Sequence, residues 1–381
     1  MFKLLRVTDR AGASFVSHIH IQSAMRTTSY LVLYPQDHSY WAPITVINHL
    51  YRAVEHSSSE PINMRFPSLT QEWHTESYRS IDPSRPELSA AGKVVAITGG
   101  GGSIGGAIAI AFAKAGAKGI AIIGRRNQPL QEVKGQILQA VPGATVQAIS
   151  GDISDAQSMK RALDQVKKDI GAIDIMIANA GHFSGFTLLQ QADEQEWWRA
   201  FETNVKGAFN TTRAFASVAV ENATLVNIST GIAHMPAMPQ ASSHAASKLA
   251  ATKIYEVFGK EHAGISVFHV QPGSIDLETH RKAGVPADDQ GEHTAVHYGS
   301  CVSVTNWATI ADLPGSFVVW LVSPEGSFLR GKYLWVSWDV DELKSRREEL
   351  EKPGKLMISL EGWPFGRSGA ATDALKEYLD K

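Results

Sequence analysis

The sequence is almost free of cysteine, the residue that disulfide bonds and many structural zinc sites require. Cys301 is the single cysteine among 381 residues, which excludes an intramolecular disulfide framework and a cysteine-based zinc cluster. Neither sign of charge is in clear excess, because 36 Lys and Arg face 38 Asp and Glu. This balance lacks the basic surplus of proteins that bind nucleic acid or anionic lipid, and no apolar run reaches the ~20 residues of a membrane span. We therefore expect no metal, nucleic-acid or membrane partner.

The residues that are present have the composition of a globular protein. Hydrophobic residues make up 44% and charged residues 19%, which excludes a wholly disordered chain. Many of the 32 glycines gather near residue 100. This cluster is the first candidate for a functional loop.

From Lys93 onward, short β-branched runs alternate with Ala-rich stretches, which is the pattern of βαβ units around a parallel sheet. The alternation predicts an α/β fold, a doubly wound Rossmann-type sheet with helices on both faces. The predicted strands cover 93–98, 119–123, 145–149, 173–178, 224–229, 265–270 and 332–337. The predicted helices cover 104–115, 128–140, 155–169, 193–220, 240–262 and 315–322, and an irregular stretch covers about 274–314.

The chain divides by composition into four parts. Residues 1–63 lack periodicity and are expected to form a poorly ordered extension, while 64–91 form a lead-in with two prolines between 81 and 87. Residues 92–340 are expected to form one Rossmann-type domain with an insertion near 290–310, followed by a tail over 341–381. The basic N-terminus is similar to a mitochondrial presequence, but an extension or a wrongly chosen start codon is favoured, and we expect a cytoplasmic protein.

The glycine cluster follows the first predicted strand directly. The run Gly99-Gly-Gly-Gly-Ser-Ile-Gly105 leads from that strand into the first Ala-rich helix. Glycines let a backbone approach a ligand closely, and the free N–H groups at a helix start attract a pyrophosphate. At the head of a βαβ series, this arrangement predicts a dinucleotide site.

Two arginines follow the second predicted strand. In a doubly wound fold, the end of this strand meets the adenosine ribose, where an acidic residue suits free hydroxyls and arginine suits a 2′-phosphate. Arg125 and Arg126 therefore favour NADP(H) over NAD(H). The alternative is a solvated basic turn.

These motifs and several others together resemble the classical short-chain dehydrogenase/reductase family, and its filamentous-fungal secondary-metabolism members most of all. The turn from Thr98 to Gly105 is similar to the family's T-G-x-x-x-G-x-G motif, with Ser103 at the middle glycine. The resemblance implies about seven parallel strands and a homodimer or homotetramer. It also implies cofactor contacts from Gly99, Ser103, Ile104, Gly105, Arg125, Arg126, Asp152, Ile153, Asn179, Ala180, Gly181, Lys248, Pro272, Gly273 and Ile275.

The catalytic motif of the family, Y-x-x-x-K, corresponds here to His244-Ala-Ala-Ser-Lys248. Residues i and i+4 share one helix face, so the spacing is kept while histidine replaces tyrosine. The family's catalytic serine maps to Thr230, with Ser229 adjacent, and its nicotinamide-contacting threonine maps to Leu277. The resemblance therefore implies a catalytic set of Asn204, Thr230, His244 and Lys248.

Two functions stay open at this point. The first is an NADP(H)-dependent oxidoreductase that reduces a ketone, or oxidises a secondary alcohol, of a small secondary metabolite. The second is a protein of the same fold with impaired or no redox activity, either a cofactor-binding pseudoenzyme or a non-redox isomerase or cyclase. The second arises because a neutral imidazole at His244 can polarise a carbonyl or act as a base, yet it donates a full proton poorly.

Two further segments bear on partners and substrate. Trp197, Trp198, Phe201, Val205 and Phe209 follow helical spacing, which favours core or interface packing over a substrate platform. The segment 234–239 follows Thr230 and contains two methionines and two prolines, which favours an apolar, bulky substrate.

Overall fold

The computed structural model describes residues 68–273 and 311–359, together with four two-residue strands. The strands β1 (Val7–Thr8) and β2 (Ser14–Phe15) pair antiparallel, and so do β9 (Val296–His297) and β10 (Ser303–Val304). The chain divides into the units Met1–Pro61 and Ile62–Lys381, and the main sheet belongs to the second. Most of the predicted extension and insertion, and also Ile275, lie outside the described residues.

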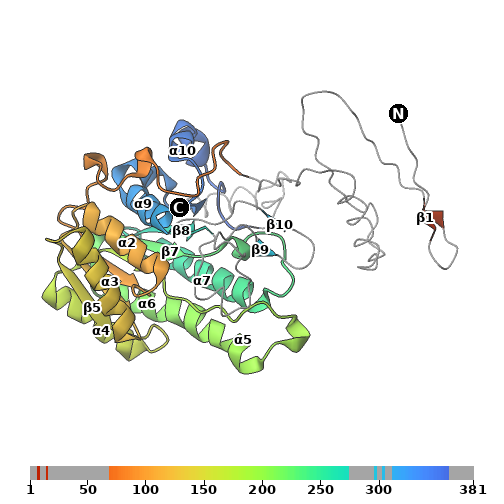
Figure 1. The fold of residues 1–381 in the computed structure, drawn as a ribbon, viewed down its shortest axis with the longest axis horizontal. Coiled ribbons are helices and arrows are strands. Elements are labelled where there is room, and N and C mark those ends of the chain that lie inside the picture. Colours follow the sequence, from red (N-terminus) through yellow and green to blue (C-terminus); the bar gives the residue numbers. More distant parts are fainter. Residues whose placement is uncertain are drawn as a thin grey trace, which may run out of the picture. The chain divides into compact units, whose positions relative to one another are not determined.

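A seven-stranded parallel sheet forms the centre of this unit (Figure 1). Its order is β11-β8-β7-β6-β3-β4-β5, so the connections run outward in both directions from β3 and β6. This order confirms the doubly wound fold. The strands are β3 (Val94–Thr98), β4 (Gly119–Gly124), β5 (Val146–Ser150), β6 (Ile173–Ala178), β7 (Ala219–Ile228), β8 (Ser266–Gln271) and β11 (Tyr333–Trp335).

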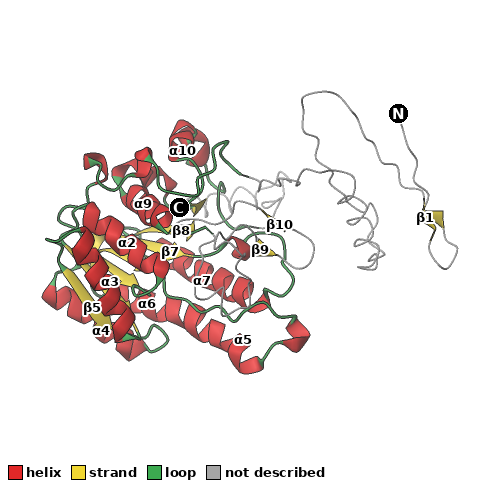
Figure 2. Ribbon diagram, in the orientation of Figure 1, coloured by secondary structure: helices red, strands yellow, loops and turns green. Residues whose placement is uncertain are grey.

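Helices cover both faces of the sheet (Figure 2). Strand β3 is buried throughout, with Val95 and Ile97 in one apolar cluster and Val94 and Ala96 in the other, as the two-residue repeat of a strand requires. The first cluster includes residues of α2 (Ser103–Lys114), α3 (Asn127–Ala140) and α9 (Asp312–Val322). The second includes residues of α4 (Ala156–Asp169), α6 (Gly207–Ala216) and α7 (Ser242–Glu261).

The helix predicted over 193–220 is interrupted and ends early. It consists of α5 (Glu194–Phe201), a π-helical turn at Glu202–Lys206 and α6. The predicted end at residue 220 is wrong, because β7 begins at Ala219, which pairs with Ile173 of β6. Alanine and valine at 218–220 continued the helical pattern in sequence, but pairing with β6 draws them into the sheet.

The lead-in and the start of the tail pack against the domain. Ile81 and Leu88 are fully buried in the lead-in, and Leu343 and Leu350 are fully buried in the tail. His74 Nε2 of the lead-in lies 2.9 Å from Asp339 Oδ2 at the end of the domain, and the Gln71 N–H donates to Glu342 Oε2 of the tail at 2.9 Å. The tail forms α10 (Val340–Ser345) and α11 (Arg347–Leu350). Short 3-10 turns occur at Arg79–Ile81, Pro86–Leu88, Leu189–Gln191, Gly231–Ala233 and Pro324–Leu329.

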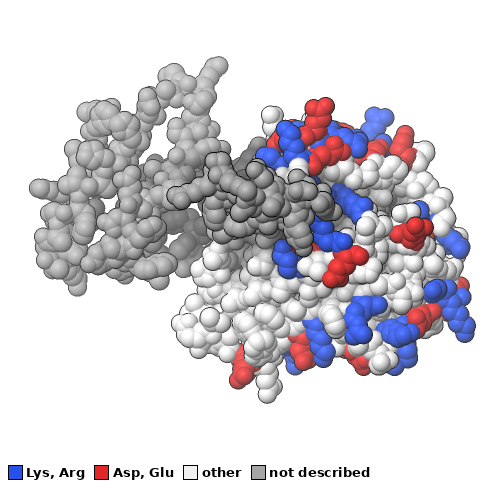
Figure 3. Space-filling view, turned by 180° about the vertical axis from the view of Figure 1, so that it is seen from behind, with Lys and Arg blue, Asp and Glu red and all other residues white. Residues whose placement is uncertain are grey.

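The described surface carries charges of both signs. Figure 3 shows Lys and Arg interspersed with Asp and Glu around a wide uncharged area. Within residues 68–273 and 311–359, no group of His, Cys, Asp and Glu side chains is arranged to hold a metal ion. No helix in the same described part is long and apolar enough to cross a membrane.

Candidate active site

A cavity of about 610 Å³ lies at the carboxyl ends of the strands. It includes the crevice between β3 and β6, where the strand order reverses and where open α/β sheets bind their ligands. Most of the predicted site residues line it, so the fold brings together segments that are far apart in sequence. The predicted residues in its wall are Gly99, Ser103, Ile104, Gly105, Arg125, Arg126, Asp152, Ile153, Asn179, Ala180, Gly181, Thr230, His244, Lys248, Pro272 and Gly273.

The glycine turn is built to lie close against neighbouring backbone. Gly99 has φ +65°, and a Cβ there would come within 2.8 Å of Asn179 Nδ2. A Cβ on Gly105 would come within 2.4 Å of the Gly99 carbonyl oxygen. Helix α2 then begins at Ser103 without a side-chain cap, so no side chain accepts from its first N–H groups. Its first residues, Ser103, Ile104 and Gly105, line the cavity. This uncapped start fits a pyrophosphate.

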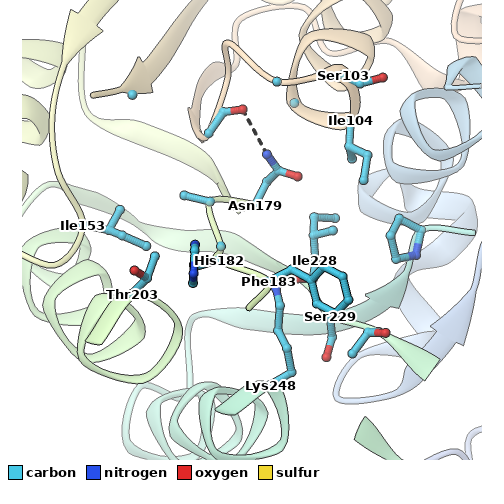
Figure 4. Close-up of a pocket in the computed structure, with 18 of the residues that line it drawn as sticks. Ser103, Ile104, Ile153, Asn179, His182, Phe183, Thr203, Ile228, Ser229 and Lys248 are labelled. Atoms are coloured by element: carbon cyan, nitrogen blue, oxygen red, sulfur yellow. Dashed lines mark hydrogen bonds between the residues drawn. The ribbon is translucent and has the colours of Figure 1, made fainter. Parts of the chain in front are cut away.

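Asn179 fixes this turn to the end of β6. Its Nδ2 donates to the Thr98 carbonyl oxygen at 3.0 Å and to the Gly99 carbonyl oxygen at 3.2 Å. Figure 4 shows the second of these bonds as a dashed line. Thr98 Oγ1 in turn accepts from the main-chain N–H groups of Asn179 and Ala180, both at 3.1 Å. Asn179 therefore links the ends of two neighbouring strands, β3 and β6.

The adenosine end of the predicted site has both charge and an apolar wall. Arg125 and Arg126 follow β4 and are exposed at the cavity. Asp152 Oδ1 accepts from the Ser154 main chain at 2.9 Å, and Ile153 is buried beside it. This part of the cavity fits an adenine ring and a phosphorylated ribose.

Helix α7 carries His244 and Lys248 to the opposite end of the cavity. Lys248 Nζ donates to the Ile228 carbonyl oxygen at 2.8 Å, and Figure 4 shows its side chain extending toward the end of β7. Burial lowers the pKa of Lys248 to about 8, so the ammonium is the main form at neutral pH. Gly181 leaves room here, because a Cβ on it would meet Lys248 Nζ at 3.2 Å.

Asn204 lies in the π-helical turn and is buried. Its Oδ1 accepts from the His182 N–H at 2.8 Å, and its Nδ2 donates to the His182 carbonyl oxygen and to Ser247 Oγ, both at 2.9 Å. These bonds join the loop after β6 to helix α7 through Asn204, and its catalytic role stays a prediction.

The two hydroxyl-bearing residues at the end of β7 are hydrogen-bonded to residues of β11 and α7. Thr230 lines the cavity, and its main chain is hydrogen-bonded to Tyr333 of β11. Ser229 is buried next to it, with its Oγ 3.3 Å from Thr252 Oγ1 of α7. Both hydroxyls therefore belong to one rigid corner between β7, α7 and β11.

Several residues in the cavity wall were missed by sequence reasoning. His182 and Phe183 directly follow the predicted site residues Asn179, Ala180 and Gly181, a position that could have indicated them. His182 Nε2 lies 2.5 Å from Glu196 Oε1 of α5. Phe186 and Trp335 also line the cavity, and nothing in the local sequence of Trp335 indicates this, because β11 reaches the site only through the sheet order.

Comparisons with known proteins agree with this geometry. A family model described as short chain dehydrogenase matches residues 93–288. The short chain dehydrogenase citE of Monascus ruber is 30% identical over 297 residues, which cover 75% of this chain and 94% of that protein. The short chain dehydrogenase andI of Emericella variicolor is 29% identical over 306 residues, covering 78% and 97%.

Solved structures show the same architecture. A short chain dehydrogenase from Burkholderia cenocepacia, crystallised in complex with NADP, is similar with a TM-score of 0.57 and 26% identity. The similarity covers 66% of this chain and 99% of that one. A dehydrogenase/reductase from Sinorhizobium meliloti has a TM-score of 0.56 at 26% identity, covering 68% and 97%.

Proposed function

The chain belongs to the short-chain dehydrogenase/reductase family, and from this premise we propose that it is an NADP(H)-dependent oxidoreductase. Its substrate is a ketone, or the matching secondary alcohol, of a small secondary metabolite. The observation that carries the proposal is the meeting of three features in one cavity, namely the uncapped helix α2, the arginine pair after β4 and the His244–Lys248 pair.

The cofactor, when bound, supplies or accepts the hydride, and this chain's residues bind and orient it. The N–H groups at the start of α2 hold the pyrophosphate. Arg125 and Arg126 neutralise the 2′-phosphate, which disfavours NAD(H). Lys248 holds the nicotinamide ribose through its ammonium, whose Nζ is already fixed by the Ile228 carbonyl.

His244 takes the position of the family's tyrosine but interacts with the substrate carbonyl in a different way. A neutral imidazole at this position polarises a carbonyl oxygen by donating a hydrogen bond. Thr230 orients the same oxygen with its hydroxyl. In the oxidative direction the neutral imidazole accepts the proton of the alcohol.

A second candidate is a protein that binds the dinucleotide without efficient redox activity. The observation that favours it is the joint change of Ser103, Thr230, His244 and Leu277 from the residues usual in the family. Such a protein would keep NADPH affinity, since Gly99, Gly105 and the two arginines remain in the cavity wall.

The decisive experiment compares wild type, His244→Ala and His244→Tyr in two assays. NADPH affinity, measured by cofactor fluorescence, should be similar in all three, because His244 lies at the substrate end. Carbonyl reduction over a ketone panel should fall about 100-fold or more in His244→Ala, the usual size of an acid–base contribution. Turnover by His244→Tyr alone would establish the second candidate, and failure of every variant to bind NADPH or NADH would refute both.

We also propose that the protein forms a homodimer or homotetramer through α5, α6 and α7. Trp198 is 53% exposed and Phe209 49% exposed, although both are large and apolar. Leu249 and Val257 of α7 are exposed as well, and α7 packs against α5 and α6. A second copy of this face would cover these side chains.

A further inference from the structure

The substrate end of the cavity is lined by Phe183, Phe186, Met235 and Trp335. We propose that these side chains form an aromatic binding site, which selects a planar, uncharged aryl ketone over a saturated ketone with the same carbon skeleton. This inference rests on the proposed function and specifies the class of substrate that the same site accepts.

One wall of this site stands directly beside His244. The Phe183 ring meets the His244 ring edge to face, with centroids 5.0 Å apart and planes at 76°. Phe186 packs against Phe183 in the same manner, at 5.0 Å and 74°. An aromatic ring prefers this edge-to-face arrangement or an offset stack with its neighbours, so the wall presents good contacts to a further ring.

The other wall is the indole of Trp335, which the structure holds in one orientation. Its Nε1 donates to His234 Nε2 at 3.0 Å, and it packs on Trp73 and Trp338, with ring centroids 5.9 and 6.3 Å away. The indole also lies close over Gly231, because a Cβ there would come within 2.9 Å of it. A ring fixed in this way loses little entropy when a ligand binds.

The two walls belong to opposite sides of the substrate end. Phe183 and Phe186 follow β6, whereas Trp335 ends β11, and β7 and β8 lie between these strands. Three interstrand spacings separate the ends of β6 and β11 by roughly 14 Å, so the two walls are distinct surfaces of the cavity. Among the described lining residues at this end there is no carboxylate, and Lys248 is the one lysine or arginine. The other groups there that can bind oxygen include the side chains of Ser229, Thr230, Gln271, His182 and His244. An uncharged ring system with one carbonyl group fits this set of lining side chains.

A matched pair of ketones tests the inference. 1-Tetralone and 1-decalone share one bicyclic skeleton, but only the first contains an aromatic ring. Equilibrium dialysis against the full-length protein should show about three- to tenfold tighter binding of 1-tetralone, the size expected for one aromatic contact. Trp335→Leu and Phe183→Leu should bring this ratio close to one, while Trp335→Phe keeps a ring and should retain most of it.

Phe328→Leu provides the control, since Phe328 is 7% exposed in the core and does not line the cavity. It should leave the ratio unchanged, because a general loss of stability weakens both ketones alike. Equal binding of the two ketones by wild type, or an unchanged ratio in folded Trp335→Leu and Phe183→Leu, overturns the inference. Preferential binding without reduction would instead count against the proposed redox function and leave the aromatic site standing.

Discussion

The hydroxyl of Tyr333 is bonded to both main-chain polar groups of Thr230. It donates to the Thr230 carbonyl oxygen at 2.7 Å and accepts from the Thr230 N–H at 3.1 Å. Burial raises the pKa of Tyr333, so the hydroxyl stays protonated and keeps both bonds. The closing strand of the sheet thereby sets the position of the residue that replaces the family's catalytic serine.

Tyr333→Phe removes this clamp and leaves the Thr230 main chain without these partners. We expect the free energy of unfolding to fall by about 2 kcal/mol, the cost of unpaired buried polar groups. The kcat for ketone reduction should fall as well, while the KM for NADPH stays unchanged because the cofactor cradle is untouched. Urea unfolding and steady-state kinetics measure the two effects, and an unchanged kcat in the folded variant would show that Thr230 does not depend on the clamp.

Gly105→Ala tests the close approach of the glycine turn. The added Cβ would meet the Gly99 carbonyl oxygen at 2.4 Å, so the turn must move, and overpacking of this kind costs about 1–3 kcal/mol. NADPH affinity, measured by fluorescence titration, should weaken about tenfold or more. Gly135→Ala in α3 is the matched control, since a Cβ there meets nothing within 4 Å and should stabilise the helix by about 0.5–1 kcal/mol. If both variants changed NADPH affinity equally, the glycine turn would not be the phosphate-binding site.

Arg125→Asp tests the cofactor preference. It replaces a cation that suits the 2′-phosphate by a carboxylate that suits free ribose hydroxyls. The ratio of NADPH to NADH affinity should fall about 10- to 100-fold, since charge-assisted hydrogen bonds contribute about 1.5–3 kcal/mol. Arg161→Asp makes the same charge change at an exposed position outside the cavity and should leave the ratio unaffected. If the ratio stays constant in Arg125→Asp, the basic turn is merely solvated.

The pKa of Lys248 gives the protein a defined response to pH. Its folded-state value of about 8 lies below the ordinary 10.5 because burial disfavours the ammonium. Between these values the unfolded chain binds the proton that the folded protein has released, so this lysine adds stability as pH rises through the window. The gain approaches about 3 kcal/mol. The free energy of unfolding of wild type should therefore rise relative to that of Lys248→Met as pH increases from 7 to 10.5. The measurement is made without cofactor. A difference independent of pH would mean that the ammonium is not desolvated.

Trp198→Glu tests the proposed subunit contact. A carboxylate in the middle of the apolar face of α5 would be desolvated on assembly, so the variant should sediment as a monomer. Met357→Glu introduces the same charge at another exposed apolar side chain, outside α5, α6 and α7, and should assemble like wild type. Analytical ultracentrifugation distinguishes these outcomes. If wild type itself sediments as a monomer, the proposed homodimer or homotetramer is refuted.

The sequence predicted the fold well wherever the evidence was local. The alternation of strands and helices and the glycine turn between Gly99 and Gly105 are set by neighbouring residues, because side-chain period and backbone freedom act over a few positions. The boundary before β7 failed for the same reason. Ala219 has no local mark of a strand and becomes one by pairing with Ile173.

The element types, the glycine turn and the His244–Lys248 spacing could be predicted, since each is encoded within a few consecutive residues. Which distant segments meet is visible only in the folded protein. The sheet order brings Tyr333 behind Thr230 and places Trp335 in the same cavity as Phe183. These contacts depend on burial of both sheet faces by the whole chain, a property that no local pattern contains.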